Sequence, residues 1–345
     1  MNSREERSGR AEVNRSSPEG WLCGFDYVRA FFVVAIVAGH CGIFKVIVEF
    51  PLLHYASFHY TFLLGVPVFY QLSLYLYVRR ASAEPDYFRK RVGKLLVIFL
   101  FWWPINLLLT GQPDSLYKFL VVEREPLISI LMGNHTLMYF VLGLIIYVIL
   151  CEILIRLNVH RRAFGVQLLL IIGSCGVMVI GQETFHKIFG FYLGYANPLN
   201  FLPYVFTSLA LVNIGRNSSR HLNALGVCLG LIFLSFAIAE YGLHSRYAVF
   251  WRYTYFEYAR VSLVAASALV VISFARLDVT PPRWVIHLSD LSLGIYVTHS
   301  ITMFVVIKVS ESFGMTVNVF ALFAATLSLS LAASAAIKYR AAQII

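Results

Sequence analysis

FDYVRAFFVVAIVAGH, residues 25–40, is an apolar run that carries Asp26 and Arg29 at its start. It predicts a membrane helix over 25–47 with His40 near its middle. Arg29 and His40 are eleven residues apart, which is close to three helical turns. Both side chains are therefore expected on one face, roughly 16 Å apart along the helix axis.

His40 is the first functional candidate. If Arg29 lies at a membrane surface, His40 lies about halfway through a hydrocarbon core of roughly 30 Å. An ionisable group at that depth is costly and marks a functional site by default. The alternative is a structural histidine, bonded inside a helix bundle, beside an interfacial Asp26–Arg29 pair.

The composition favours a membrane protein. Hydrophobic residues make up 59% of the 345 residues, charged residues make up 13%, and the mean hydropathy is +0.72. A soluble domain carries roughly 25% charged residues. The fold class is therefore an all-α membrane protein, and the net charge of +10 does not imply a nucleic-acid partner. The five cysteines form no CxxC pair, which argues against a zinc site and a disulfide framework.

Apolar segments suggest a bundle of about ten transmembrane helices. They are expected at 25–47, 57–78, 93–110, 136–156, 164–181, 200–215, 222–240, 256–275, 285–308 and 315–337. Most Lys and Arg residues fall in alternate connections, which predicts that both termini are cytoplasmic. Residues 1–22 are polar and are expected to form a disordered cytoplasmic tail, followed by a transmembrane domain over 23–340.

A basic run follows the second predicted span and includes FRKRVGK, residues 88–94. Arg91 and Lys94 share a helix face at the start of the third span. They are placed to meet a phosphate-bearing ligand from the cytoplasm, since both residue types bind phosphate. The simpler interpretation is a positive-inside anchor.

Polar groups also interrupt the ninth span, in LSDLSLGIYVTHS, residues 288–300. Asp290, Tyr296 and His299 lie in this apolar stretch, and Tyr296 and His299 share a face. Hydrogen bonding inside the bundle is the alternative to a functional role. Gly-rich phosphate loops, a nucleophile elbow, HExxH and any metal-ligand cluster are absent, so a serine hydrolase or metalloenzyme has no support and no metal site is expected.

The outer connections are rich in aromatic residues, and 111–135 ends in His135. Tyr and Trp at span ends usually form an interfacial belt. The alternative is a platform for a sugar acceptor. No sequence repeat is visible, which weakens a transporter built from inverted repeats.

Four stretches resemble the acyltransferase 3 family of integral membrane acyltransferases. FDYVRAFFVVAIVAGH is similar to the Asp, Arg and His signature that opens the family. GVPVFYQLS at 65–73, YFRKRVGK at 87–94 and LSLGIYVTH at 291–299 resemble later family motifs, in order. The resemblance covers about residues 24–340. The sequence departs from the family pattern at Leu74, where Gly is usual, and at Lys94, where Arg is common.

The resemblance implies a multi-pass protein, expected in the bacterial inner membrane. Its implied reaction is transfer of an acyl group, usually acetyl, from cytoplasmic acyl-CoA to a hydroxyl of an extracytoplasmic glycan or lipid-linked glycan. Acyl-CoA, expected to be acetyl-CoA, is then a co-substrate, and no tightly bound cofactor is implied. The other partners are the saccharide acceptor and the lipid bilayer, while the oligomeric state stays open.

The resemblance also suggests roles for residues. His40 is expected to be the general base, with a covalent acyl-histidine as the competing route. Arg29 and Asp26 are grouped with His40 as catalytic residues. Arg29 is expected to hold coenzyme A phosphates together with Arg91 and Lys94, and Asp26 to orient Arg29. Phosphate groups of acyl-CoA are assigned to Arg89, Arg91 and Lys94, and the acceptor side is assigned to His135, Tyr139, Tyr296 and His299.

Two other classes of protein remain open. Ten spans with an intramembrane His and Arg also suit a transporter of a glycan, lipid or small anion, which would not depend on coenzyme A. A non-catalytic membrane scaffold would tolerate substitution of His40 and Arg91.

Overall fold

The computed structural model describes residues 23–47, 49–81, 83–84, 86–110, 136–189, 197–217, 219–246 and 258–340. These residues form helices and short connections, with no strand among them. The helices are α1 (Gly24–His40), η1 (Ile43–Ile47), α2 (Pro51–Ser57), η2 (Phe58–Leu63), α3 (Gly65–Ala81), α4 (Tyr87–Thr110), α7 (Tyr139–Arg156), η4 (Val159–Arg161), α8 (Phe164–Phe189), η6 (Pro198–Phe201), α9 (Leu202–Asn217), α10 (Ser219–Arg246), α11 (Val261–Phe274), α12 (Arg283–Ser312) and α13 (Val319–Arg340). The predicted tail, 1–22, and His135 lie outside the described residues.

The predicted all-α membrane architecture is confirmed. Among the described residues, seven helical segments are long and apolar enough to cross a bilayer. They are Pro51–Ala81, Tyr87–Leu109, Tyr139–Arg156, Phe164–Gly181, Asn223–Gly242, Arg283–Ser312 and Val319–Arg340. Two further apolar helices, in α9 and α11, are shorter. Each of the ten predicted segments coincides with a helix, while the cytoplasmic placement of the termini stays a prediction.

The first predicted span was wrong at its end. The α-helix stops at His40, a turn with Gly42 at a φ of 83° follows, and residues 43–47 form a 3-10 helix. His40 is therefore the last residue of α1 and does not lie near the middle of a longer helix. The second span was predicted too short, because helical structure runs almost without interruption from Pro51 to Ala81.

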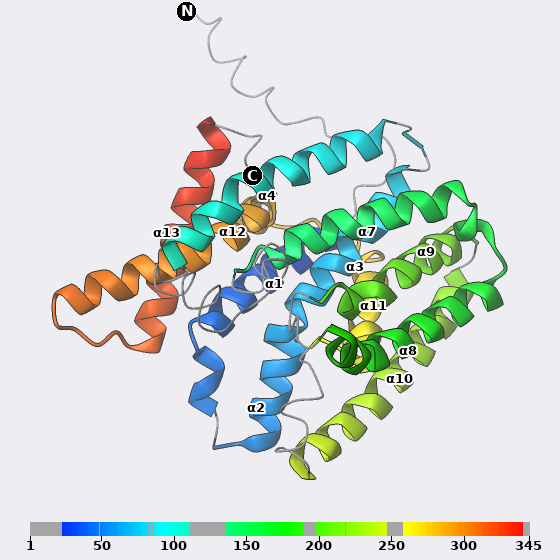
Figure 1. The fold of residues 1–345 in the computed structure, drawn as a ribbon, viewed down its shortest axis with the longest axis horizontal. Coiled ribbons are helices and arrows are strands. Elements are labelled where there is room, and N and C mark those ends of the chain that lie inside the picture. The colour runs from blue at the N-terminus through cyan, green and yellow to red at the C-terminus, as the bar shows by residue number, and fades with distance from the viewer. Residues whose placement is uncertain are drawn as a thin grey trace, which may run out of the picture.

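Two helix groups make up the bundle (Figure 1). In the first, α12 packs against both α1 and α13. In the second, α3 packs against α7, α9 and α11, while α8 and α10 cover α9 and α11. The groups meet where α1 contacts α3, α11 and η2, and α4 joins them by packing against both α7 and α12. Gly65 permits this approach, since a Cβ there would lie 2.7 Å from a side-chain carbon of Ile36.

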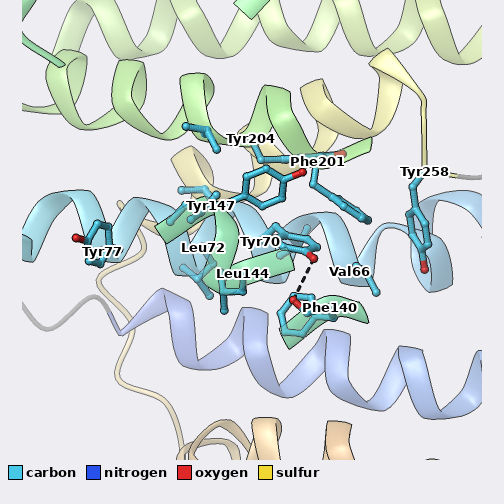
Figure 2. Packing of buried hydrophobic residues seen from close by; sticks show 14 of the residues in the cluster. Val66, Tyr70, Leu72, Tyr77, Phe140, Leu144, Tyr147, Phe201, Tyr204 and Tyr258 are labelled. Atoms are coloured by element: carbon cyan, nitrogen blue, oxygen red, sulfur yellow. Dashed lines mark hydrogen bonds between the residues drawn. The ribbon is translucent and has the colours of Figure 1, made fainter. Parts of the chain in front are cut away.

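Aromatic side chains fill the core around α3 (Figure 2). Tyr70 is fully buried, stacks on Phe201 at 4.2 Å, and donates a hydrogen bond to the carbonyl of Phe140 at 3.0 Å. The ring of Phe140 in turn contacts Tyr296 of α12, with ring centroids 4.9 Å apart. This series of rings ties the core of the second group to the middle of α12.

Candidate functional site

His40 lies at the meeting point of the two helix groups. Its side chain is exposed, although most of α1 before it is buried. The ring centroids of His299 and Phe62 each lie 5.1 Å from that of the His40 imidazole, and the planes of the Phe62 and His40 rings are close to perpendicular. The structure therefore brings together two histidines that the sequence separates by more than 250 residues.

His299 is fully buried, and its protonation pattern follows from its contacts. Its Nδ1 lies 2.7 Å from the carbonyl oxygen of Tyr296 and 3.2 Å from that of Ile295. Carbonyl oxygens only accept hydrogen bonds, so Nδ1 carries the proton. Its Nε2 is buried and has no hydrogen-bond partner among the described residues. In the neutral ring, that nitrogen presents a lone pair.

Tyr296 stands one turn before His299, and the two rings are 5.8 Å apart. The Tyr296 hydroxyl donates to the carbonyl of Leu137 at 2.8 Å. Tyr139 lies beside it, and its own hydroxyl donates to Tyr258 at 3.3 Å. Of the four residues predicted on the acceptor side, Tyr139, Tyr296 and His299 are thus brought together near His40.

The depth of the two histidines is set by α12. His299 is the seventeenth of its thirty residues, so it lies near the middle of a helix long enough to cross a bilayer. His40 ends α1 but reaches the same level. His40 therefore lies level with the middle of α12, and its depth in the bilayer stays a prediction.

Phe62 reaches His40 because of a local irregularity. Residues Phe58–Leu63 form a π-helix between α2 and α3. Such wide turns often occur at functional sites, because they rotate the following side chains relative to a regular α-helix. The Phe62 ring then lies over Gly39, where any Cβ atom would collide with it.

A second cluster lies three turns away at the other end of α1. Arg29 pairs with Asp26 at 3.8 Å, and Asp26 accepts a hydrogen bond of 2.6 Å from Ser289 of α12. Asp26 is buried, whereas the side chain of Arg29 is 33% exposed. The carboxylate is held by two helices and keeps one side of the guanidinium fixed.

Other cations gather around Arg29. It lies close enough to Arg91 of α4 and Arg80 of α3 for their charges to repel it. Lys94 is likewise near Arg91 and near Lys338 of α13. Four helices therefore contribute like charges to one end of the bundle, which favours a polyanion as the bound species. We call Arg29, Arg80, Arg91, Lys94 and Lys338 the basic cluster.

Asp290 borders the basic cluster. Its carboxylate pairs with Lys338 at 3.5 Å and attracts Arg29. Arg89 is different, because it is exposed and none of its contacts with described residues joins it to Arg29, Arg80 or Arg91. Of the three residues assigned to phosphate binding, the structure brings Arg91 and Lys94 into the cluster and leaves Arg89 apart.

Comparison with known protein families covers almost the whole chain. The model of the acyltransferase 3 family, described as an acyltransferase domain, matches residues 24–339. The chain belongs to the acyltransferase 3 family. The searches of curated proteins and of solved structures found no match. The family and the apolar helices together identify a multi-pass membrane acyltransferase.

Sequence reasoning assigned no role to Arg80, Lys338, Ser289 or Phe62, which lie near the two sites of this acyltransferase. Arg80 belongs to the same basic run as Arg91, and Lys338 follows the last predicted span, which the expected topology places at the same membrane face as Arg91. Ser289 is one of several serines in the ninth span. Phe62 is one of 28 phenylalanines, and no sequence signal predicts a π-helix at Phe58–Leu63.

Proposed function

We propose that this acyltransferase moves an acyl group, expected to be acetyl, from cytoplasmic acyl-CoA to a hydroxyl of an extracytoplasmic glycan or lipid-linked glycan. The observation that carries the proposal is the distance between the basic cluster and His40. Arg29 and His40 are eleven positions apart on one helix, which corresponds to about 16 Å along its axis. Coenzyme A has the same layout, with phosphates at one end of an extended arm and the thioester at the other.

The donor end of the reaction is assigned to the basic cluster. The adenosine phosphates bind Arg29, Arg91 and Lys94, because a guanidinium or ammonium group forms charge-assisted hydrogen bonds with phosphate oxygens. Asp26 and Ser289 hold Arg29 in place for that contact. The pantetheine arm then follows α1 towards His40 and delivers the thioester there.

The acceptor end is assigned to the exposed ring of His40. Its imidazole removes the proton of the acceptor hydroxyl while the oxygen attacks the thioester carbonyl. The carbon–sulfur bond breaks as the tetrahedral intermediate collapses, and the proton passes from His40 to the thiolate of coenzyme A. The reaction releases free coenzyme A and the acylated glycan.

Neither Tyr296 nor His299 has a proton available to stabilise the oxyanion of the tetrahedral intermediate. The Tyr296 hydroxyl already gives its proton to Leu137, and the Nδ1 proton of His299 is held by two carbonyls. A neutral His299 has no proton left to donate from Nε2. Neither side chain is therefore assigned to the oxyanion.

The test uses sealed membrane vesicles of both orientations and acetyl-CoA labelled in the acetyl group. Label is followed into the glycan and lipid-linked glycan fractions, for wild type and His40→Ala. Transfer only when acetyl-CoA meets the cytoplasmic face, and its loss in His40→Ala at normal protein level, is the expected result. Transport of an acceptor-like solute without acetyl transfer would overturn the proposal in favour of a transporter.

A second measurement separates the base from an acyl-histidine. Vesicles stripped of acceptor are given unlabelled acetyl-CoA and labelled free coenzyme A. Direct attack predicts no exchange of label into acetyl-CoA, because no half-reaction occurs without acceptor. Exchange that depends on His40 would instead establish a covalent acyl-imidazole, since its formation releases coenzyme A reversibly.

A further inference from the structure

The contact between His40 and His299 has a consequence for the charge that forms during catalysis. When His40 takes a proton from the acceptor, its ring becomes a cation inside the bundle. A cation in a low-dielectric environment is unstable unless an acceptor or a negative charge faces it. The environment of His40 must therefore supply one.

Two groups in the structure meet that need. One is the C-terminal end of α1, because the unpaired carbonyls of a last turn favour a positive charge. The other is Nε2 of His299, which is buried, lies in a ring 5.1 Å from that of His40, and has no partner among the described residues. His40 itself forms no hydrogen bond with a described residue, so one of its nitrogens is available for this contact.

We infer that His299 is a positioning residue whose Nε2 accepts a hydrogen bond from the His40 imidazolium, and so stabilises the base after it has taken the proton. This inference rests on the proposed function. The inference requires that a rotation of the exposed His40 side chain bring one of its N–H groups to the lone pair of Nε2, and the 5.1 Å between the two ring centroids leaves the rings near enough for this. No proton is transferred to His299, and no bond to the acyl group is formed by it.

The rest of α12 fixes the direction of that lone pair. Carbonyls of Ile295 and Tyr296 hold the Nδ1 proton of His299. The ring of Tyr296 is fixed by its hydroxyl bond to Leu137 and by Phe140. The tautomer is therefore set before substrate binds, in the way that a carboxylate sets the tautomer of the histidine in a catalytic triad.

The inferred hydrogen bond uses only the Nε2 atom of His299. Substitutions that remove or replace this one acceptor therefore test the inference directly. His299→Leu fills the buried site with an apolar side chain and removes the nitrogen that accepts the hydrogen bond. His299→Gln keeps an acceptor oxygen at about the same reach. His287→Leu is the matched control, since His287 is an exposed histidine three turns earlier on α12.

The measurement is the initial rate of acetyl transfer in inverted vesicles, at saturating and at varied acetyl-CoA. A hydrogen bond to a charged group contributes enough that His299→Leu is expected to lower the saturated rate about ten- to hundredfold. The acetyl-CoA concentration for half the maximal rate is expected to stay unchanged. His299→Gln should recover part of the rate, and His287→Leu should match wild type.

Rescue by His299→Gln decides whether the acceptor atom at this position carries the role. A full-rate His299→Leu enzyme, or a His299→Gln enzyme that is stably folded and as slow as His299→Leu, would overturn the inference. Thermal unfolding of each purified variant in detergent shows whether a low rate comes from misfolding. In that case the variant unfolds at a lower temperature than wild type.

Failure of the proposed function gives a different result. If wild type transfers no acetyl group, or if His40→Ala keeps full transfer, the proposed function itself is wrong. If wild type and His40→Ala behave as expected but the His299 variants transfer acetyl at the wild-type rate, the inference is wrong and the proposed function stands.

Discussion

A Cβ atom on Gly39 would collide with the ring of Phe62, and the centroid of that same ring lies 5.1 Å from that of the His40 imidazole. The residue before the proposed base is therefore glycine for a steric reason. The His40 imidazole thus has two ring neighbours, Phe62 and His299.

The Gly39 contact gives the first prediction. Gly39→Ala should raise the intrinsic helix propensity of α1 by about 1 kcal/mol. It should nevertheless lower the rate of acetyl transfer, because the new methyl group displaces Phe62 from His40. The half-saturating acetyl-CoA concentration should not change. Gly173→Ala in α8 is the control, since a Cβ there meets no other atom within 4 Å. Equal rates for the two variants would contradict this account.

The basic cluster gives a prediction about the donor. Arg91→Ala should raise the half-saturating concentration of acetyl-CoA and leave the saturated rate nearly unchanged, because it removes a phosphate contact far from the thioester. Acetyl-dephospho-CoA, which lacks the 3′-phosphate, shows which phosphate is bound. If Arg91→Ala discriminates less than wild type between acetyl-CoA and acetyl-dephospho-CoA, the Arg91 side chain binds the 3′-phosphate. Arg89→Ala, whose side chain lies apart from the cluster, should behave as wild type.

The ion pair at the border of the cluster predicts an effect of opposite sign. Asp290 neutralises Lys338 and attracts Arg29. Asp290→Asn should therefore strengthen donor binding, and lower the half-saturating acetyl-CoA concentration by up to about fivefold, since exposed ion pairs are worth up to about 1 kcal/mol. The effect should fade at high salt. Glu311→Gln, which breaks a comparably exposed pair with Lys308 at the other end of α12, should leave donor binding unchanged. Weaker donor binding in Asp290→Asn would rule out this role of the carboxylate.

A buried ion pair gives a prediction about stability. Glu240 of α10 and Arg260 are each 5% exposed and lie 3.9 Å apart. Glu240 also accepts a hydrogen bond of 2.5 Å from Ser262, and Arg260 donates one of 2.8 Å to Tyr55. Glu240→Leu should lower the free energy of unfolding by about 3–5 kcal/mol, because it leaves a buried cation unpaired.

The paired replacement is the control for that change. Glu240→Leu combined with Arg260→Met removes both charges, and should restore much of the stability lost in the single variant. Thermal unfolding in detergent measures both. If Glu240→Leu unfolds at the wild-type temperature, the pair contributes nothing to the fold.

The helices were predictable because their signal is strong and local. Each predicted segment coincides with a helix, since lipid requires every spanning backbone to satisfy its own hydrogen bonds. The end of α1 was not predictable in the same way. Residues after His40 remain apolar, and the chain turns at Gly42 because of packing between α1, η1 and η2, which hydropathy does not register.

The candidate site was predictable in its members more than in its contacts. Spacing within one helix placed Arg29 and His40 on one face and paired Tyr296 with His299. Contacts between helices, such as His40 with His299 or Arg29 with Arg91, depend on how distant segments pack, and the family resemblance was needed to suggest that they work together. Arg89 was included because it belongs to the same basic run. It lies two positions from Arg91, which puts the two residues on different faces of the helix, and its role in phosphate binding stays a prediction.

The helix arrangement separates two tasks within one site. His40 and His299 both come from the group formed by α1, α12 and α13, whereas Phe62 and Tyr139 come from the group around α3. Rigid sliding of one group past the other would carry both imidazoles together and change only the wall that faces them. A change on the α3 side therefore alters the surroundings of the two imidazoles without separating them, because both are held by the packing of α1 on α12.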